Sequence, residues 1–497
     1  MANVSTIEGI RVSADHWIGG SRVPSSDMFL DLSPIDLETL AMVARGGRKE
    51  ADAAVAAARD AFPGWAATEP KQRSAVLHRV GELVEARVSQ LAVVETTDNG
   101  SLLRSMQRSV MPRVARNFHF FADQLLALHE DDLEMGEHRS RVEWDPAGVA
   151  VVITPWNAPL MLGTWRLAPA LAAGNTVVFK PPEWAPLTAS MLCDIAREAG
   201  MPDGVLNVVQ GIGEEAGAAL VAHPNVDRIA FTGSVETGKL VSAAAAPNLT
   251  PISLELGGKA PFLIFADADL DAAIAQAVNQ YDNAGQVCLA GTRLLVERGI
   301  HDEFLDRFLE RASALKQGDP RLTDTDLGPQ ITRGHFDRVD GFVQRAKEEG
   351  AKAVLGGGPN EDLGGLYYRP TLFVDVPPEA EILKKEVFGP VLTLQSFDTE
   401  DDGVALANGT DYGLDAIVYT GDEQRADRVA PKLVAGTVWV NCFFVRDLRA
   451  PFGGARNSGI GREGGRWSFD FWADVKNVCT APWAGSAGGP GGGGRKG

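Results

Sequence analysis

Hydrophobic and polar positions alternate along the middle of the chain in a pattern typical of a parallel β-sheet covered by helices. Short apolar runs predict buried strands at 149–153, 176–179, 205–209 and 228–231. Between them, apolar residues at helical spacing predict helices at 160–173, 188–199 and 214–222. This alternation predicts an α/β fold in which ligands bind at the carboxyl ends of the strands.

The segments on either side of this region predict further elements. Residues 49–62 have apolar positions at helical spacing, which predicts a helix. A second α/β section is expected over about 252–440, followed by loop and strand over 441–482. The charged segment 130–145 is interpreted either as an arm that pairs with another subunit or as a plain surface hairpin. The Gly-rich segment 485–497 predicts a disordered tail.

Composition and charge narrow the class of protein. The 497 residues include 47 basic and 66 acidic side chains, a net charge of −19, which argues against binding nucleic acid or anionic membranes. We find no run of about 18 uninterrupted apolar residues and no signal-peptide pattern at the N-terminus, so a cytoplasmic protein is expected. The eight histidines and four cysteines show no metal-ligand spacing, and no metal site is predicted.

Two glycine-rich turns are candidates for binding a dinucleotide. The first, GIGEEA at 211–216, contains Gly213 and fits the G-x-G-x-x-A pattern, but no convincing acidic residue ends the next strand. The second, FTGSVETG at 231–238, runs from a strand into a helix, where the Ser234 hydroxyl and the free N–H groups could bind a phosphate. For either turn alone, an ordinary strand-to-helix connection is an equally good interpretation.

The stretch VVFKPPEWAP at 177–186 favours NAD over NADP. Lys180 ends a predicted strand, and Glu183 follows two prolines that stiffen the loop. A carboxylate there could accept hydrogen bonds from both hydroxyls of an adenosine ribose and would repel a 2′-phosphate. Taken by themselves, these two residues would more often be a solvated surface pair.

One cysteine lies among small residues in NAGQVCLAG, at 283–291. Most free cysteines are buried and inert. A reactive Cys288 therefore requires a base, a cofactor site and an oxyanion site from elsewhere in the chain.

Seven motifs resemble, in order and separation, the aldehyde dehydrogenase superfamily over about residues 15–482. They are TPWNAP, FKPPEWAP, FTGSVETG, LELGGK, GQVCLAGTR, EVFGPV and PFGGARNSGIGRE. The resemblance implies NAD(P)-dependent oxidation of aldehydes to carboxylic acids by a homodimer or homotetramer. It also implies an α/β fold with a Rossmann-type parallel-sheet NAD domain, an α/β catalytic domain and a small β oligomerisation arm. The expected bounds are 1–128 and 149–254 for the NAD domain, 255–440 for the catalytic domain, 129–148 and 470–484 for the arm, and 441–469 for a segment that returns to the cofactor and substrate region.

The resemblance also implies roles for single residues. Cys288 would attack the aldehyde carbonyl to form a thiohemiacetal, and Glu255 would activate the water that hydrolyses the later thioester. Asn157 and the Cys288 backbone N–H would stabilise the oxyanion. Glu386 would hold the nicotinamide ribose, with Phe388 beside the ring. The other implied NAD contacts are Thr154, Pro155, Trp156, Lys180, Glu183, Gly213, Gly233, Ser234, Gly238 and Leu256.

The segment NCFFVRDLRAPFGG at 441–454 bears on the substrate. It resembles the branch of the superfamily that oxidises muconic semialdehydes of aromatic catabolism, including 2-hydroxymuconic and 5-carboxymethyl-2-hydroxymuconate semialdehyde. Arg446, Arg113 and Arg449 are the candidates for holding a substrate carboxylate. An equally good interpretation is that these arginines face solvent and that one pairs with Asp447. The alternatives are a dehydrogenase for neutral aromatic or aliphatic aldehydes and a non-catalytic binding protein on this fold.

Overall fold

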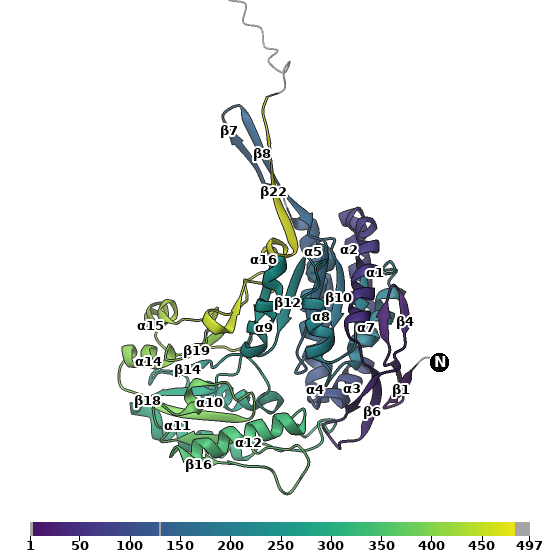
Figure 1. The fold of residues 1–497 in the computed structure, drawn as a ribbon. Helices are drawn as coiled ribbons and strands as arrows, with labels where there is room; N and C mark the ends of the chain where they lie inside the picture. The colour runs from purple at the N-terminus through teal and green to yellow at the C-terminus, as the bar shows by residue number, and fades with distance from the viewer. Residues whose placement is uncertain (1–2, 129–130, 483–497) are drawn as a thin grey trace, which may run out of the picture.

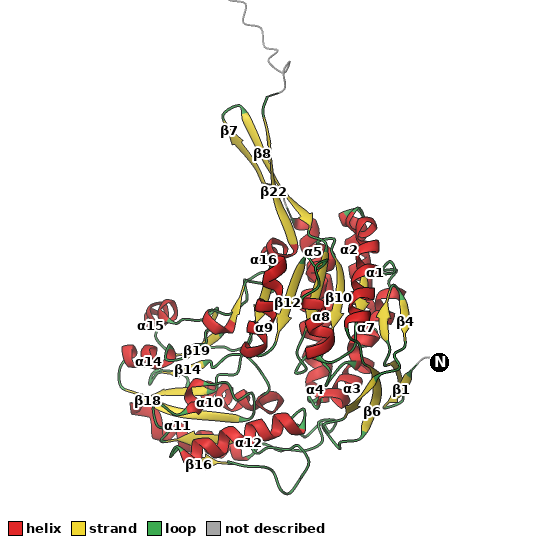
Figure 2. Cartoon of the chain, viewed as in Figure 1, coloured by secondary structure: helices red, strands yellow, loops and turns green. Residues whose placement is uncertain are grey.

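Two large β-sheets and a protruding arm organise the computed structural model, which describes residues 3–128 and 131–482 (Figures 1 and 2). The first sheet has the strand order β21-β13-β12-β9-β10-β11-β3-β4, and its five central strands run parallel. The predicted α/β class is confirmed. The strands of this sheet are β3 (His16–Ile18), β4 (Ser21–Val23), β9 (Val149–Ile153), β10 (Thr176–Lys180), β11 (Leu206–Val208), β12 (Arg228–Thr232), β13 (Ile252–Glu255) and β21 (Gly459–Ile460).

Helices cover both faces of this sheet, which explains why its strands are apolar without alternation. Successive residues of β9 point to opposite sides, so Ala150 and Val152 pack in one hydrophobic cluster and Val149 and Val151 in another. The first cluster includes residues of α2, α5, α6 and α7, and the second includes residues of α1, α8 and α9. The helices of this lobe are α1 (Arg48–Ala66), α2 (Pro70–Glu85), α3 (Val88–Asn99), α4 (Leu103–Ser105), α5 (Met111–Ala127), α6 (Pro159–Ala172), α7 (Leu187–Glu198), α8 (Ala218–Val221) and α9 (Val235–Ala245).

Most predicted elements of this lobe are present, with small shifts of their ends. The helix expected at 214–222 is divided into a π-helical turn, Gly213–Gly217, and the short α8. Two antiparallel hairpins precede α1 and lie at the N-terminal side of the lobe (Figure 1). Their strands are β1 (Val4–Ile7), β2 (Ile10–Ser13), β5 (Met28–Leu32) and β6 (Thr39–Ala44).

The second sheet has seven strands in the order β16-β17-β18-β15-β14-β19-β20, and all neighbours run parallel except β16 with β17. Its strands are β14 (Pro261–Ile264), β15 (Arg293–Glu297), β16 (Lys352–Leu355), β17 (Thr371–Val374), β18 (Val391–Phe397), β19 (Asp415–Tyr419) and β20 (Thr437–Val440). Its helices are α10 (Leu270–Val278), α11 (His301–Ser313), α12 (Arg333–Glu348), α13 (Glu381–Lys384), α14 (Glu400–Ala407) and α15 (Glu423–Val429).

A three-stranded antiparallel arm projects from the first lobe (Figure 1). It consists of β7 (Asp131–Met135), β8 (His138–Pro146) and β22 (Ala473–Thr480), in the order β22-β8-β7. These strands fall within the two segments expected to form an arm. Residues 129–130 and 483–484 of those segments, and the tail expected at 485–497, lie outside the described residues.

The expectation of only loop and strand over 441–482 is wrong, because a helix, α16 (Gly465–Trp472), precedes β22. Phe469 and Trp472 are three residues apart and share one buried helical face. The Ser468 hydroxyl accepts a hydrogen bond from the Gly464 N–H at 2.9 Å and supports the first turn. Two glycines in front of a short aromatic run hid this helix from the sequence pattern. In the part of the chain that the structure describes, no helix is both long and apolar enough to cross a membrane.

Candidate active site

Two cavities of about 250 and 260 Å³ meet in the region between the two sheets. The first cavity is bordered by α5 and α6 of the first lobe and by the loop that carries Arg446. The second cavity is bordered by the start of α9 and by α12. The residues that line both are Asn157, Leu162, Thr232, Glu255, Leu256 and Cys288. The structure thus brings the three predicted catalytic residues together at the junction of the two cavities.

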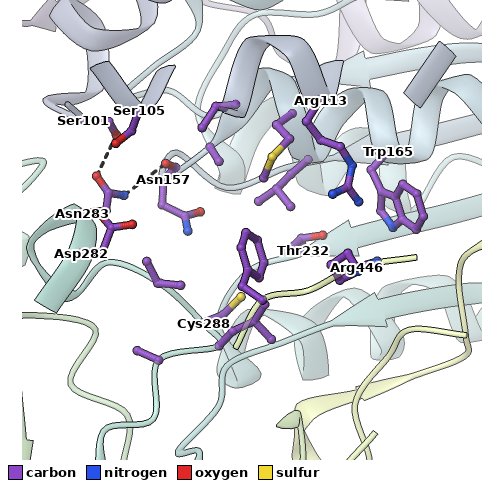
Figure 3. A pocket seen from close by; sticks show the side chains of 18 of the residues that line it. Ser101, Ser105, Arg113, Asn157, Trp165, Thr232, Asp282, Asn283, Cys288 and Arg446 are labelled. Carbon is purple, nitrogen blue, oxygen red and sulfur yellow. Dashed lines mark hydrogen bonds between the residues drawn. The ribbon is translucent and has the colours of Figure 1, made fainter. Parts of the chain in front are cut away.

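Cys288 lies on the loop between α10 and β15, partly exposed to the cavities (Figure 3). Burial raises the pKa of its thiol far above the usual range, and the nearby carboxyl groups of Glu386, Asp415 and Glu255 raise it further. The turn before it is unusual, because Asn283, Ala284 and Gly285 all have positive φ. The thiol is therefore protonated at rest and needs a base before it can act as a nucleophile.

Glu255 ends β13, and its carboxyl group is a candidate base at the junction of the two cavities. Its Oε1 atom is buried without a hydrogen-bond partner, and burial raises the pKa of the carboxyl group to about 8. The carboxyl of Glu463 raises this pKa too, whereas Arg166, Arg446 and Arg462 lower it. A carboxyl group that ionises near neutral pH is suited to taking and returning a proton.

A charged pair near Glu255 was not predicted from the sequence. Arg166 on α6 and Glu463 form an ion pair of 2.7 Å, and both side chains are almost fully buried. Arg166 lies in the middle of an otherwise apolar helix, which was a signal that its charge has a buried partner. Its partner lies about 300 residues further along the chain, so no local pattern connects the two.

Asn157 follows β9 and is held by other amide side chains (Figure 3). Its Nδ2 donates to the backbone carbonyl of Gln286 at 2.9 Å. Its own backbone carbonyl accepts from the Nδ2 atoms of Asn99 and Asn283, and its Oδ1 is buried without a partner. One N–H of the Asn157 amide is not used by the Gln286 contact. It remains available as a donor at the place where the two cavities meet.

Two arginines, Arg113 of α5 and Arg446, stand at one end of the first cavity beside Trp165 (Figure 3). Their guanidinium carbons lie 5.6 and 5.1 Å from the Trp165 ring centre. Burial, together with the charge of Arg446, lowers the pKa of Arg113 to about 10. Neither guanidinium forms an ion pair with a carboxylate of residues 3–128 or 131–482, and the Nη2 of Arg446 is buried without a partner. Arg449 is not brought to this cavity; its exposed side chain pairs with Asp447 at 2.6 Å.

Aromatic rings form a wall of the second cavity. Trp156 lies with its ring centre 5.1 Å from that of His335 and 5.3 Å from that of Phe388. Glu386 faces this wall, and its Oε1 accepts a hydrogen bond from the Gly258 N–H at 3.0 Å. Burial raises the pKa of Glu386 to about 7. His335 and Arg338 of α12 also line this cavity, and the sequence analysis did not single them out.

The start of α9 opens into the second cavity through Gly233 and Ser234. Ser234 is the N-cap, and its hydroxyl accepts from the Thr237 N–H at 3.1 Å. A helix start of this kind attracts anions. Pro155 lines the cavity beside Trp156.

The other predicted contacts lie outside the lining of the second cavity. Lys180 is buried at the end of β10, and its Nζ donates to the Pro181 carbonyl at 2.8 Å and to Glu183 at 3.4 Å. Gly238 lies under Leu256, where an added Cβ would come within 2.7 Å of the leucine side chain. The remaining two positions are Thr154, which is buried after β9, and Gly213, which begins the π-helical turn.

Comparison with known proteins identifies one family. The aldehyde dehydrogenase family matches residues 23–478. The chain is 43% identical to 2-hydroxymuconic semialdehyde dehydrogenase of Pseudomonas sp. (strain CF600), covering 94% of this chain and 99% of that protein. It is 42% identical to 2-aminomuconic semialdehyde dehydrogenase of Danio rerio, with 94% and 98% coverage. A solved structure of a point mutant of betaine aldehyde dehydrogenase from Staphylococcus aureus, in complex with NAD+, is 36% identical with a TM-score of 0.92, covering 95% and 98% of the two chains.

Proposed function

Because this chain belongs to the aldehyde dehydrogenase family, we propose that it uses NAD to oxidise a carboxylate-bearing semialdehyde to the corresponding acid. The observation that carries the choice of substrate is the pair Arg113 and Arg446, which face the same cavity as Cys288. Muconic semialdehydes, the substrates named for two of the relatives, combine an aldehyde with a carboxylate and fit this requirement.

Three residues are proposed to perform the chemistry. After a base removes its proton, the Cys288 sulfur attacks the aldehyde carbon and forms a thiohemiacetal. The free N–H of the Asn157 amide and the Cys288 backbone N–H donate to the carbonyl oxygen as it gains negative charge. After oxidation leaves a thioester, ionised Glu255 takes a proton from water, and the hydroxide oxygen displaces the sulfur to release the acid.

The residues of the second cavity fit a dinucleotide. An added Cβ at Gly257 would lie 2.1 Å from Glu386, so glycine leaves the space in which that carboxylate can face a ribose. Ser234 and the start of α9 would bind a phosphate, and Glu386 and Phe388 would hold the nicotinamide end. Lys180 and Glu183, which lie outside the lining of this cavity at the end of β10, would bind the adenosine ribose. When bound, NAD supplies the acceptor for the hydride that leaves the substrate carbon.

Arg113 and Arg446 form no ion pair within the described residues, although the carboxyl groups of Glu255 and Glu463 favour the charged form of Arg446. Two guanidinium groups close together in a cavity repel each other, and desolvation makes each charged form less favourable. A planar substrate carboxylate would accept hydrogen bonds from both and would offset this repulsion.

The test is a panel that compares a semialdehyde with a neutral aldehyde of similar length, following NADH production at constant pH. We expect Arg446→Met and Arg113→Met each to lower kcat/KM for the semialdehyde by about tenfold or more, because a hydrogen bond between charged groups is lost. Arg113→Met should leave kcat/KM for the neutral aldehyde nearly unchanged. Arg446→Met also removes a charge that lowers the pKa of Glu255, so its kcat/KM should fall for both aldehydes and fall further for the semialdehyde.

Arg449→Met is the matched control, because Arg449 is an arginine of the same loop that lies outside the cavity. It should retain the kcat/KM of the wild type for both substrates. Equal turnover of both aldehydes by the wild type, with no selective loss in the Arg446 and Arg113 variants, would favour the dehydrogenase for neutral aldehydes instead.

We further propose that the chain assembles as a homodimer or homotetramer through its arm. The outer edges of β7 and β22 have no strand partner within the described residues, and Leu133 and Val475 expose more than half of their side chains there. Exposed apolar strand edges are sites of pairing with another chain. A cytoplasmic location stays a prediction from the sequence.

A further inference from the structure

Two side chains of α12, those of His335 and Arg338, line the second cavity. The helix itself lies in the second lobe, beside β16 (Figure 1). Thr332 caps this helix, and its hydroxyl accepts from the His335 N–H at 3.1 Å. His335 and Arg338 are three positions apart in the helix, so they are neighbours on its surface. The cap therefore fixes where both side chains leave the helix.

These two side chains hold three consecutive carbonyl groups of another segment. The His335 Nε2 lies 2.8 Å from the carbonyl of Phe388. Arg338 donates from Nη1 to the carbonyl of Val387 at 2.6 Å and from Nη2 to that of Glu386 at 3.0 Å. Burial lowers the pKa of His335 to about 4, so the ring is neutral and its Nε2–H is the donor.

The segment held in this way, 386–388, is also fixed from its other sides. The Glu386 carboxylate accepts from the Gly258 N–H, three residues after Glu255. Phe388 has φ of +61°, a conformation that a bulky residue keeps only when its surroundings hold it. The next residue touches the turn before Cys288, since an added Cβ at Gly285 would lie 2.0 Å from the Gly389 carbonyl oxygen. The segment thus connects α12 with both catalytic loops.

We propose that His335 and Arg338 are positioning residues for the cofactor, which lock segment 386–388 so that the Glu386 carboxylate stays where it meets the nicotinamide ribose. This inference rests on the proposed function in one respect, that NAD occupies the second cavity. His335 and Arg338 act through their hydrogen bonds to the backbone carbonyls of 386–388. The neighbouring Trp156 ring, which contacts both His335 and Phe388, completes the support.

Arg338 has a second effect, which can be separated from its hydrogen bonds. Its positive charge lowers the pKa of the Glu386 carboxyl group against the larger effect of burial. Two other charged groups act on this pKa: Lys259 lowers it and Glu236 raises it. The Tyr412 hydroxyl and the Cys288 thiol also interact with the Glu386 carboxylate. Removal of the Arg338 charge should therefore raise the pH at which Glu386 ionises.

The test measures NAD binding by isothermal titration calorimetry, without substrate and without turnover. His335→Phe keeps an aromatic ring and removes the donor, and we expect it to raise the Kd of NAD at least about fivefold. His335→Gln keeps a donor and should bind more tightly than His335→Phe. Arg338→Met should also raise the Kd at least about fivefold. Arg345→Met is the matched control on the same helix, because Arg345 pairs with Glu381 away from the cavity, and it should bind as the wild type does.

Titration at several pH values adds a readout that a loss of general stability would not change. The wild type should bind NAD more weakly as the pH falls through about 7, because Glu386 becomes protonated. Arg338→Met should move this midpoint to higher pH. Arg338→Lys keeps the charge and loses the paired hydrogen bonds, so it should weaken binding without moving the midpoint.

The outcomes separate the two proposals. A folded wild type that does not bind NAD would overturn the proposed function. A wild type that binds NAD, together with His335→Phe and Arg338→Met that bind within about fivefold of it, would overturn the positioning role alone. If Arg338→Met does not fold, as judged by its thermal midpoint, the comparison of His335→Phe with His335→Gln decides the question.

Discussion

The pKa of the Glu255 carboxyl group depends on the groups that surround it. This carboxyl group is buried against the backbone at Gly453, where an added Cβ would lie 2.9 Å from Oε1, and near a second carboxyl group, that of Glu463. The buried ion pair with Arg166 keeps Glu463 in place. Glu463 also lines the first cavity, and its charge is one through which the ionisation of Glu255 can be tuned.

We expect Glu463→Gln to lower the pKa of Glu255, since a neighbouring negative charge is removed and the Arg166 charge is left unopposed. In the proposed mechanism Glu255 acts as a base only when ionised, so the rate should fall as the pH drops through its pKa of about 8. The acidic limb of the kcat profile should therefore move to lower pH in this variant. The measurement is steady-state NADH production between about pH 6 and pH 10.

Glu255→Gln provides the control for this experiment. Without a base for thioester hydrolysis, it should release one burst of NADH per active site and then stop. An acidic limb that stays in place, or moves to higher pH, in Glu463→Gln would contradict the coupling of the two carboxyl groups.

Residues that act locally could be predicted from the sequence, whereas residues that act through distant partners could not. Cys288, Glu255 and Asn157 each stand in a motif, and the structure brings all three to one junction of cavities. His335 and Arg338 hold carbonyl groups about 50 residues away, and their own surroundings in the sequence resemble any polar helix start. Hydrogen bonds to a remote backbone leave no local pattern.

Among the elements, predictability follows the strength of the apolar pattern. The buried strands β9, β10 and β12 could be predicted because both faces of their sheet are covered, so their central residues are apolar without alternation. α16 could not, because its two buried aromatic residues, Phe469 and Trp472, span only one turn. The π-helical turn at Gly213–Gly217 differs from an α-helix only in hydrogen-bond register, which periodicity over five residues does not distinguish.

The turn before Cys288 is an element whose shape requires glycine at one position. Gly285 has φ of +73°, and an added Cβ would lie 2.0 Å from the Gly389 carbonyl oxygen. We expect Gly285→Ala to displace either this turn or segment 386–389, and to lower the free energy of unfolding by about 2 kcal/mol or more. Activity should fall by more than the fraction of unfolded protein accounts for, because both displaced segments border the candidate active site. Urea unfolding and NADH production measure the two effects.

Gly299→Ala is the matched control, because an added Cβ there would meet no atom within 4 Å. It should change neither the unfolding free energy nor the activity by a measurable amount. A Gly285→Ala variant that unfolds and turns over as the control does would show that the turn tolerates a side chain.

At the scale of the whole molecule, the arm is the part that neither extends the two large sheets nor lines the two cavities. Three strands extend away from the two lobes (Figure 1), and they add nothing to either cavity. Ordering such strands costs about 1 to 2 kcal/mol of conformational entropy per residue, which burial against another chain would offset. The unpaired outer edges of β7 and β22 and the exposed Leu133 and Val475 are the surfaces suited to that contact.

We therefore expect the double variant Leu133→Lys and Val475→Lys to form smaller assemblies than the wild type, measured by size-exclusion chromatography with light scattering. Burying two lysines at strand edges is unfavourable, because charged side chains at an edge oppose strand pairing. Leu322→Lys is the control, since Leu322 is similarly exposed but lies far from the arm in the chain. NAD affinity should be the same in all three proteins, because neither cavity includes an arm residue. A wild type that elutes as a monomer, or a double variant with the assembly of the wild type, would mean that the arm does not mediate association.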